Sequence, residues 1–154
     1  MKLLKILSFL PAFCMMALIF YFSSHTAADS SQVSISLTQT ILEMICDLFH
    51  LNWEPALLMQ YAASAEHFIR KLAHFSEYFL LAASFSFPLH VHRIRSKKQI
   101  LLSVLFCALF AVLDEWHQTF VPGRSGAVKD CILDTFGSLC GAVTFYFVVT
   151  IRHS

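Results

Sequence analysis

Four long apolar stretches divide the sequence, at residues 6–22, 72–91, 100–118 and 131–151. A bilayer core about 30 Å thick needs about 17 to 25 apolar residues in a helix, so each stretch can cross it. The pattern predicts an all-α integral membrane four-helix bundle, with residues 23–70 as an external segment between the first and second helices. Because no repeat, low-complexity tract or linker interrupts the chain, we expect a single domain over residues 1–154.

The first stretch has a second interpretation. The basic start of the chain and the context Thr26-Ala27-Ala28 would also suit a cleaved signal peptide. We favour a retained helix because its apolar run exceeds the usual signal-peptide core. Pro11 within it predicts a kink, which membrane helices tolerate when neighbours satisfy the freed carbonyl.

The external segment contains an amphipathic pattern. Its apolar residues recur at three- and four-residue spacing: Val33, Leu37, Ile41, Met44, Ile45 and Leu48. This spacing predicts a helix whose apolar face lies on the membrane or covers the bundle, with Asp29, Ser30 or Ser31 as its cap. Pro55 suits the first turn of another helix, which we expect to continue into the second span without a break.

Composition and charge agree with a membrane protein. The chain is 57% hydrophobic and 14% charged, which is more apolar than a soluble domain can bury. Lys and Arg concentrate at residues 2–5, at residues 92–98 and at Arg152, so the positive-inside rule places both termini in the cytoplasm. Arg70, Lys71, Arg124 and Lys129 fall on the external side and need another explanation. No basic recognition surface stands out, and we expect no nucleic-acid partner.

Ionisable residues gather at the external ends of the last three spans. Each set follows one stripe: Arg70, His74 and Glu77 in the second span, Asp114 and His117 in the third, and Asp130 and Asp134 in the fourth. Because charge inside a membrane is unfavourable, such residues usually face a bundle interior and are paired. We therefore expect three helices to converge on one polar pocket, lined by His74, Glu77, Asp114, His117 and Asp134. Gly137 and Gly141 would let another helix approach the fourth closely.

The connection before the fourth span predicts a type II turn at Pro122-Gly123. Such a turn would hold Arg124 over the pocket, where its planar fork suits a carboxylate or a phosphate. Several aromatic residues near the predicted span boundaries are typical of interface anchors: Tyr21, Trp53, Tyr61, Tyr78 and Trp116.

Three motifs carry a family resemblance: residues 70–78 (RKLAHFSEY), 114–126 (DEWHQTFVPGRSG) and 130–137 (DCILDTFG). Together with Ser23-Ser24 they resemble the VanZ-like family of bacterial membrane proteins, over essentially all four helices. Cys131 departs from the family pattern, which often has an aliphatic or small residue there, but it lies outside the polar set.

The resemblance implies a multi-pass protein of the bacterial cytoplasmic membrane. One member type is linked to low-level resistance to the lipoglycopeptide teicoplanin, which acts on the external cell-wall precursor. The resemblance therefore implies action at the outer membrane face, on or around a lipid-linked envelope precursor or the lipoglycopeptide itself.

Three hypotheses remain open for the polar set: a structural lattice, a ligand-binding pocket without chemistry, and a catalytic or metal site. Imidazole and carboxylate groups suit zinc or manganese, so a divalent metal is possible, although the spacing matches no recognised signature. In an enzyme, His117 or His74 would be the acid or base, the carboxylates Glu77, Asp114 and Asp134 would orient groups or bind metal, and ligand contacts would come from Arg70, Gln118, Arg124 and Asp130. Transport is disfavoured because polar residues become sparse beyond Ser84, Ser103 and Thr144.

Overall fold

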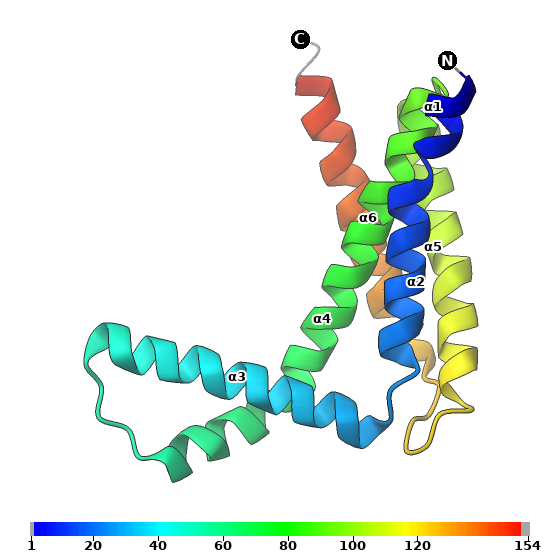
Figure 1. The fold of residues 1–154 in the computed structure, drawn as a ribbon. Coiled ribbons are helices and arrows are strands. Elements are labelled where there is room, and N and C mark those ends of the chain that lie inside the picture. The colour runs from blue at the N-terminus through cyan, green and yellow to red at the C-terminus, as the bar shows by residue number, and fades with distance from the viewer. Residues whose placement is uncertain (1, 152–154) are drawn as a thin grey trace.

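The computed structural model describes residues 2–151, which form six helices and no strand (Figure 1). These are α1 (Lys2–Leu7), α2 (Leu10–Ser23), α3 (Ala27–Phe49), α4 (Pro55–Val91), α5 (Lys97–Gln118) and α6 (Val128–Ile151). A bundle is formed by α2, the second half of α4, α5 and α6 (Figure 1). Helix α3 and the first half of α4 extend sideways from one end of this bundle. We call the end where α2 ends and α6 begins the polar end, and the end near the chain termini the terminal end. The predicted all-α class is confirmed.

Within residues 2–151, three helices are long and apolar enough to cross a membrane: Leu3–Ser23, Lys97–Gln118 and Val128–Ile151. They correspond to three of the four predicted spans. The remaining predicted span, residues 72–91, is the second half of the 37-residue helix α4, which is not among them. The expected continuity of this helix from Pro55 is confirmed. Arg152, assigned above to a cytoplasmic flank, lies outside the described residues.

Two helix starts show how local chemistry sets the boundaries. The predicted kink in the first span is a break between α1 and α2, because Pro11 lies in the first turn of α2 and cannot donate to the preceding turn. The cap of α3 is Thr26, whose Oγ1 accepts the Asp29 N–H at 3.2 Å. The prediction of Asp29, Ser30 or Ser31 was wrong. The Ala27 N–H donates to the Pro122 carbonyl at 3.3 Å, and this contact ties the helix start to the turn before α6.

The core lies where α2, α4, α5 and α6 meet. Its fully buried members are Ile19, Tyr78, Leu81, Ala82, Cys107, Ala111 and Ala142. Tyr78 is 0% exposed, so its assignment as an interface anchor was wrong; it follows His74 by one helical turn and therefore shares the inward stripe. The other four aromatic candidates are exposed.

Helices α4 and α6 approach each other at two glycines, as the sequence predicted. A Cβ atom on Gly137 would lie 2.5 Å from the Phe75 carbonyl oxygen, and one on Gly141 would lie 2.0 Å from that of Phe79. Neither distance leaves space for a side chain, so these two positions allow the backbones to touch.

Helix α3 packs on the first half of α4, and most of the side chains buried on these two segments are small. Ser34, Thr38 and Cys46 are buried on this face of α3, and Leu58 and Ala62 are buried on α4. The predicted apolar face of α3 is exposed over most of its length, with Leu37 at 52% and Leu48 at 73%. It does not cover the bundle.

Candidate functional site

Two adjoining pockets occupy the polar end, with volumes of about 610 Å³ and about 290 Å³. Arg70, His74 and Arg124 line both, and we call the combined space the polar pocket. Gln118 and Asp130 line the larger part, and Glu77 lines the smaller part beside the start of α3. Six of the nine predicted site residues therefore face one space.

Arg124 is held at this pocket by the predicted turn. The Arg124 N–H donates to the Val121 carbonyl at 3.1 Å, and Gly123 has a φ of +75°, as a type II turn requires. Its guanidinium donates to Gln118 Oε1 at 3.1 Å, to the Phe22 carbonyl at 3.4 Å and to the Ser30 hydroxyl. Burial lowers the pKa of Arg124, and the nearby charge of Arg70 lowers it further.

Gln118 connects Arg124 to a buried carboxyl group. Its Nε2 donates to Asp114 Oδ2 at 3.1 Å and to the Ser23 hydroxyl at 3.2 Å. Asp114 is 2% exposed and does not line the polar pocket. A ligand bound at Arg124 would thus be separated from Asp114 by one amide group.

Three of the four cations predicted to be external have side-chain partners. Arg70 forms an ion pair with Glu66 at 3.3 Å, and the Ser31 hydroxyl donates to Glu66 at 2.9 Å, which joins α3 to α4. Lys71 forms an ion pair with Asp130, which joins α4 to α6. With Arg124 bonded to Gln118, these cations join helices at the polar end of the bundle.

Several buried polar atoms at the polar end lack a hydrogen-bond partner in the described part of the chain. They are both carboxyl oxygens of Asp134, Asp114 Oδ1, the Tyr78 hydroxyl, and the Nδ1 atoms of His74 and His117. Such atoms are rare in proteins, and each is unfavourable by about 1–3 kcal/mol. Asp134 and Tyr78 are both 0% exposed, so their polar atoms without hydrogen bonds lie in the interior, beneath the pocket.

The two candidate histidines lie in different places. His74 lines the polar pocket, with Nδ1 at 3.9 Å from Glu77 Oε2 on the same helix. The His117 ring packs on Phe20 of α2, with a centroid distance of 4.2 Å, and does not line the pocket. Residues 114 and 117 are three apart, which turns His117 by about 60° from Asp114 on the helix and directs it to α2.

The described residues of the polar end do not supply the ligand set that a metal site would need. Among residues 2–151, no group of three or more His, Cys, Asp or Glu side chains is placed so that it could hold a metal ion. The carboxylates have other surroundings: Asp130 pairs with Lys71, and Asp114 accepts a hydrogen bond from Gln118. We therefore derive no step through a metal.

Sequence reasoning missed two polar residues that shape this end. Glu115 is 5% exposed and accepts the Ala127 N–H at 2.8 Å. This bond holds the segment between the turn and α6 in place. A Cβ atom on Gly126 would lie 2.8 Å from the Glu115 carbonyl oxygen, so this chain passes close to α5. Ser23 is 0% exposed and bonded to Gln118. The only sequence signal for these residues is their place in the quoted motifs.

Comparison with known proteins identifies the family of the chain. No curated protein and no solved structure matches the chain. A family model described as VanZ/LLP1 matches residues 8–149, a range that contains α2 to α5, nearly all of α6 and every residue of the polar pocket. The chain belongs to the VanZ/LLP1 family.

Proposed function

We propose that the chain is a multi-pass protein of the bacterial cytoplasmic membrane whose polar pocket binds the anionic headgroup of a lipid-linked envelope component at the outer face. The observation that carries the proposal is that Arg70 and Arg124, from different parts of the chain, line the same space. Two guanidinium groups facing one pocket favour a phosphate or carboxylate between them, since each offers a planar set of donors.

The proposed topology has four spans, with both termini in the cytoplasm and the polar end outside. The second half of α4 supplies the fourth span, because it lies beside α2, α5 and α6 and exposes Leu80 and Phe87 to the surroundings. The cationic residues 93–98 then stay inside, in agreement with the positive-inside rule.

Helix α3 is proposed to lie on the outer leaflet as the external amphipathic segment. Val33 lines the polar pocket together with Tyr21 and Phe22 at the end of α2, so this face of α3 points toward the membrane-spanning bundle. The exposed residues Leu37 and Leu48 continue the same face away from the bundle. Lipid would cover Leu37 and Leu48 there.

A purified protein in detergent can test the headgroup. The probes are a polyprenyl diphosphate and the polyprenyl alcohol of equal chain length, which differ only in charge. We expect the protein to bind the diphosphate more tightly, and Arg124→Ala to weaken that binding roughly 10- to 100-fold, the equivalent of one charge-assisted hydrogen bond. Lys98→Ala, an exposed cation at the terminal end, serves as the control for net charge. Equal affinity for the two probes would refute the proposal.

A cellular experiment connects binding with phenotype. As a consequence of binding, we propose low-level glycopeptide tolerance, including tolerance of teicoplanin, through reduced access to the external precursor. Alanine variants of His74, Asp114, His117 and Asp134 are compared with a deletion strain under teicoplanin, with envelope lipids profiled. Unchanged tolerance and unchanged lipids in every strain would remove both the phenotype and any chemistry on envelope lipids. If chemistry exists, the geometry favours His74 over His117, because His74 lines the pocket.

The alternative is a scaffold in which the polar set only ties helices together. The observation that favours it is Arg124, whose bonds join α2, α3 and α5. A scaffold predicts that Arg124→Ala lowers accumulation in the membrane, whereas the binding proposal predicts an inserted protein with weakened diphosphate affinity. Asp114→Asn separates binding from catalysis, since a non-catalytic pocket tolerates the amide and a catalytic carboxylate does not.

A further inference from the structure

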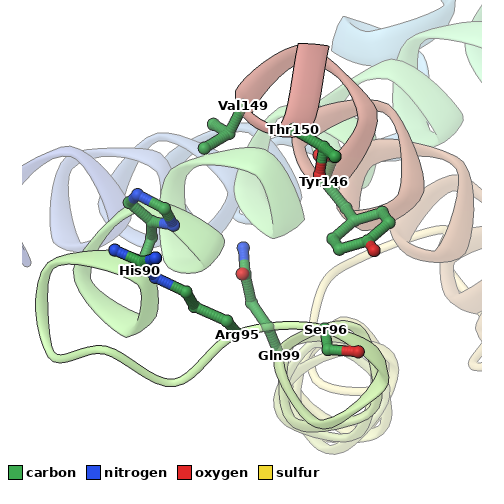
Figure 2. Close-up of a pocket in the computed structure, with 7 residues that line it drawn as sticks. All are labelled: His90, Arg95, Ser96, Gln99, Tyr146, Val149 and Thr150. Carbon is green, nitrogen blue, oxygen red and sulfur yellow. The ribbon is translucent and has the colours of Figure 1, made fainter. Parts of the chain in front are cut away.

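A second polar pocket of about 290 Å³ lies at the terminal end, far along the bundle from the polar pocket. Figure 2 shows its lining: His90 from the end of α4, Arg95 and Ser96 from the following loop, Gln99 from α5, and Tyr146, Val149 and Thr150 from α6. The Arg95 side chain extends beside His90, and Gln99 points from α5 toward α6. This pocket therefore collects polar groups from three helices where no predicted site residue lies.

Gln99 gives this pocket a fixed wall. The residue is 2% exposed, and its Nε2 donates to the Ser86 carbonyl at 3.3 Å. Ser86 in turn forms a hydrogen bond with Ser103 at 2.9 Å, and both serines are fully buried. An amide held in this way has a second hydrogen to offer to a ligand.

An apolar groove of about 460 Å³ adjoins the pocket between α4 and α6. The two share His90 and Val149, and the groove continues past Phe87 and Phe145 to Ala83. From His90 to Ala83 it follows roughly 10 Å of helix, at 1.5 Å per residue. The groove opens because the close backbone contact at Gly141 is followed by larger side chains on α6, and in Figure 1 the C-terminal end of α6 stands apart from that of α4.

The sequence segments that reach this end carry Lys and Arg side chains but no acidic ones. Segments 1–28, 78–113 and 135–154 contain no Asp or Glu, so all ten acidic residues of the chain lie elsewhere. The loop and first turn around the pocket carry Arg93, Arg95, Lys97 and Lys98. No Asp or Glu side chain of these segments can neutralise Arg95, which makes an external anion a suitable partner for it.

We propose that this end of the protein holds an anionic phospholipid of the cytoplasmic leaflet. The phosphate lies at Arg95, with Gln99 and Tyr146 as hydrogen-bond donors, and one acyl chain follows the groove past Phe87 and Phe145. The shape favours a lipid over a free phosphate, because the polar pocket continues into an apolar groove. The inference rests on the topology proposed above and is independent of what the external polar pocket binds.

Full-length protein, delipidated in a neutral detergent, tests the proposal. The probes are a phosphatidylglycerol, a phosphatidylcholine with the same acyl chains, and inorganic phosphate, with bound lipid counted by native mass spectrometry. We expect tight retention of the phosphatidylglycerol and weak retention of the other two. Arg95→Ala is expected to weaken phosphatidylglycerol binding roughly 10- to 100-fold. The matched control Lys98→Ala, which lies in the same cationic region but outside the pocket, should change it by less than about threefold.

A second variant tests the groove without changing charge. Ala83→Leu fills the far end of the groove and should weaken binding of the long-chain phosphatidylglycerol but not of a short-chain analogue. Equal binding of the two long-chain lipids, wild-type affinity in Arg95→Ala, or competition by inorganic phosphate at similar concentration would each overturn the proposal. Polyprenyl diphosphate binding, measured on the same variants, should stay unchanged, so failure here can be told apart from failure at the polar pocket.

Discussion

Gly141→Ala tests whether α4 and α6 are held together by backbone contact. The added Cβ would lie 2.0 Å from the Phe79 carbonyl oxygen and 2.8 Å from its carbon. To bring the closer contact to 3.4 Å, an ordinary van der Waals separation, the helices must move apart by about 1.4 Å. The neighbouring atoms belong to backbone, so no side chain can rotate away to relieve the clash.

The size of the effect follows from two opposing terms. Overpacking typically destabilises by about 1–3 kcal/mol, and a backbone clash of this depth belongs at the upper end. Alanine in place of glycine returns about 1 kcal/mol of helix propensity. We therefore expect a net loss of about 2 kcal/mol, which corresponds to a fall in Tm of roughly 4–8 °C for a chain of this size.

Gly137→Ala provides an internal scale for this prediction. Its Cβ would lie 2.5 Å from the Phe75 carbonyl oxygen, so the required movement is about 0.9 Å and the loss should be smaller, about 1 kcal/mol. Leu139→Ala, at a 41% exposed position on the same helix, is the control for a change that leaves this contact intact. Thermal unfolding in one detergent gives all three values. Wild-type stability in Gly141→Ala, or a larger loss in Gly137→Ala, would refute the reasoning.

Two further predictions concern Asp134 and α3. Asp134→Asn should leave the free energy of unfolding unchanged or raise it by about 1 kcal/mol, because neither carboxyl oxygen makes a hydrogen bond that the amide would lose; a clear loss of stability in chemical denaturation would show that the carboxyl group has a structural partner. Leu37→Glu should release α3 from lipid while α3 stays packed on α4. The measurement is the quenching of Trp53 fluorescence by brominated lipids, which should fall. The control Ser36→Glu, on the polar face of α3, should leave the quenching unchanged.

The sequence predicted best those features that depend on short-range rules. The predicted continuity of α4 followed from Pro55, which suits the first turn of a helix. The turn at Pro122-Gly123 and its placement of Arg124 followed from the few conformations that this dipeptide allows. The close approach of α4 and α6 followed from the spacing of Gly137 and Gly141.

What the sequence could not predict depends on contacts between distant segments. Thr26, Asp29, Ser30 and Ser31 are all suitable caps for α3, and the choice of Thr26 accompanies the bond between Ala27 and Pro122. Ser30 is bonded instead to Arg124, 94 residues away in the sequence, and Ser31 to Glu66, 35 residues away. The burial of Tyr78 was within reach, since it shares a stripe with His74, but its position near a span boundary favoured the wrong interpretation.

The direction of His117 shows the limit of stripe arguments in a bundle. A stripe gives the direction in which side chains point around one helix. It does not say which neighbouring helix lies in that direction. Asp114 and His117 share a face of α5 broadly, yet Asp114 turns toward Gln118 and His117 turns toward Phe20. Only the placement of α2 beside α5 separates them, so the sequence alone could not divide the polar set into pocket, buried layer and flank.

The two ends of the bundle handle positive charge differently, and this difference bears on what each can bind. At the polar end, Lys71 and Arg70 already have carboxylate partners, so an incoming anion must compete with Asp130 and Glu66. Such a site gains little from charge alone and selects by the geometry of its donors. At the terminal end, the segments without Asp or Glu offer Arg95 no competing carboxylate side chain, so charge favours the anion proposed there. The proposed selective site at the polar end and the proposed permissive site at the terminal end therefore follow from where the ten acidic residues lie along the chain.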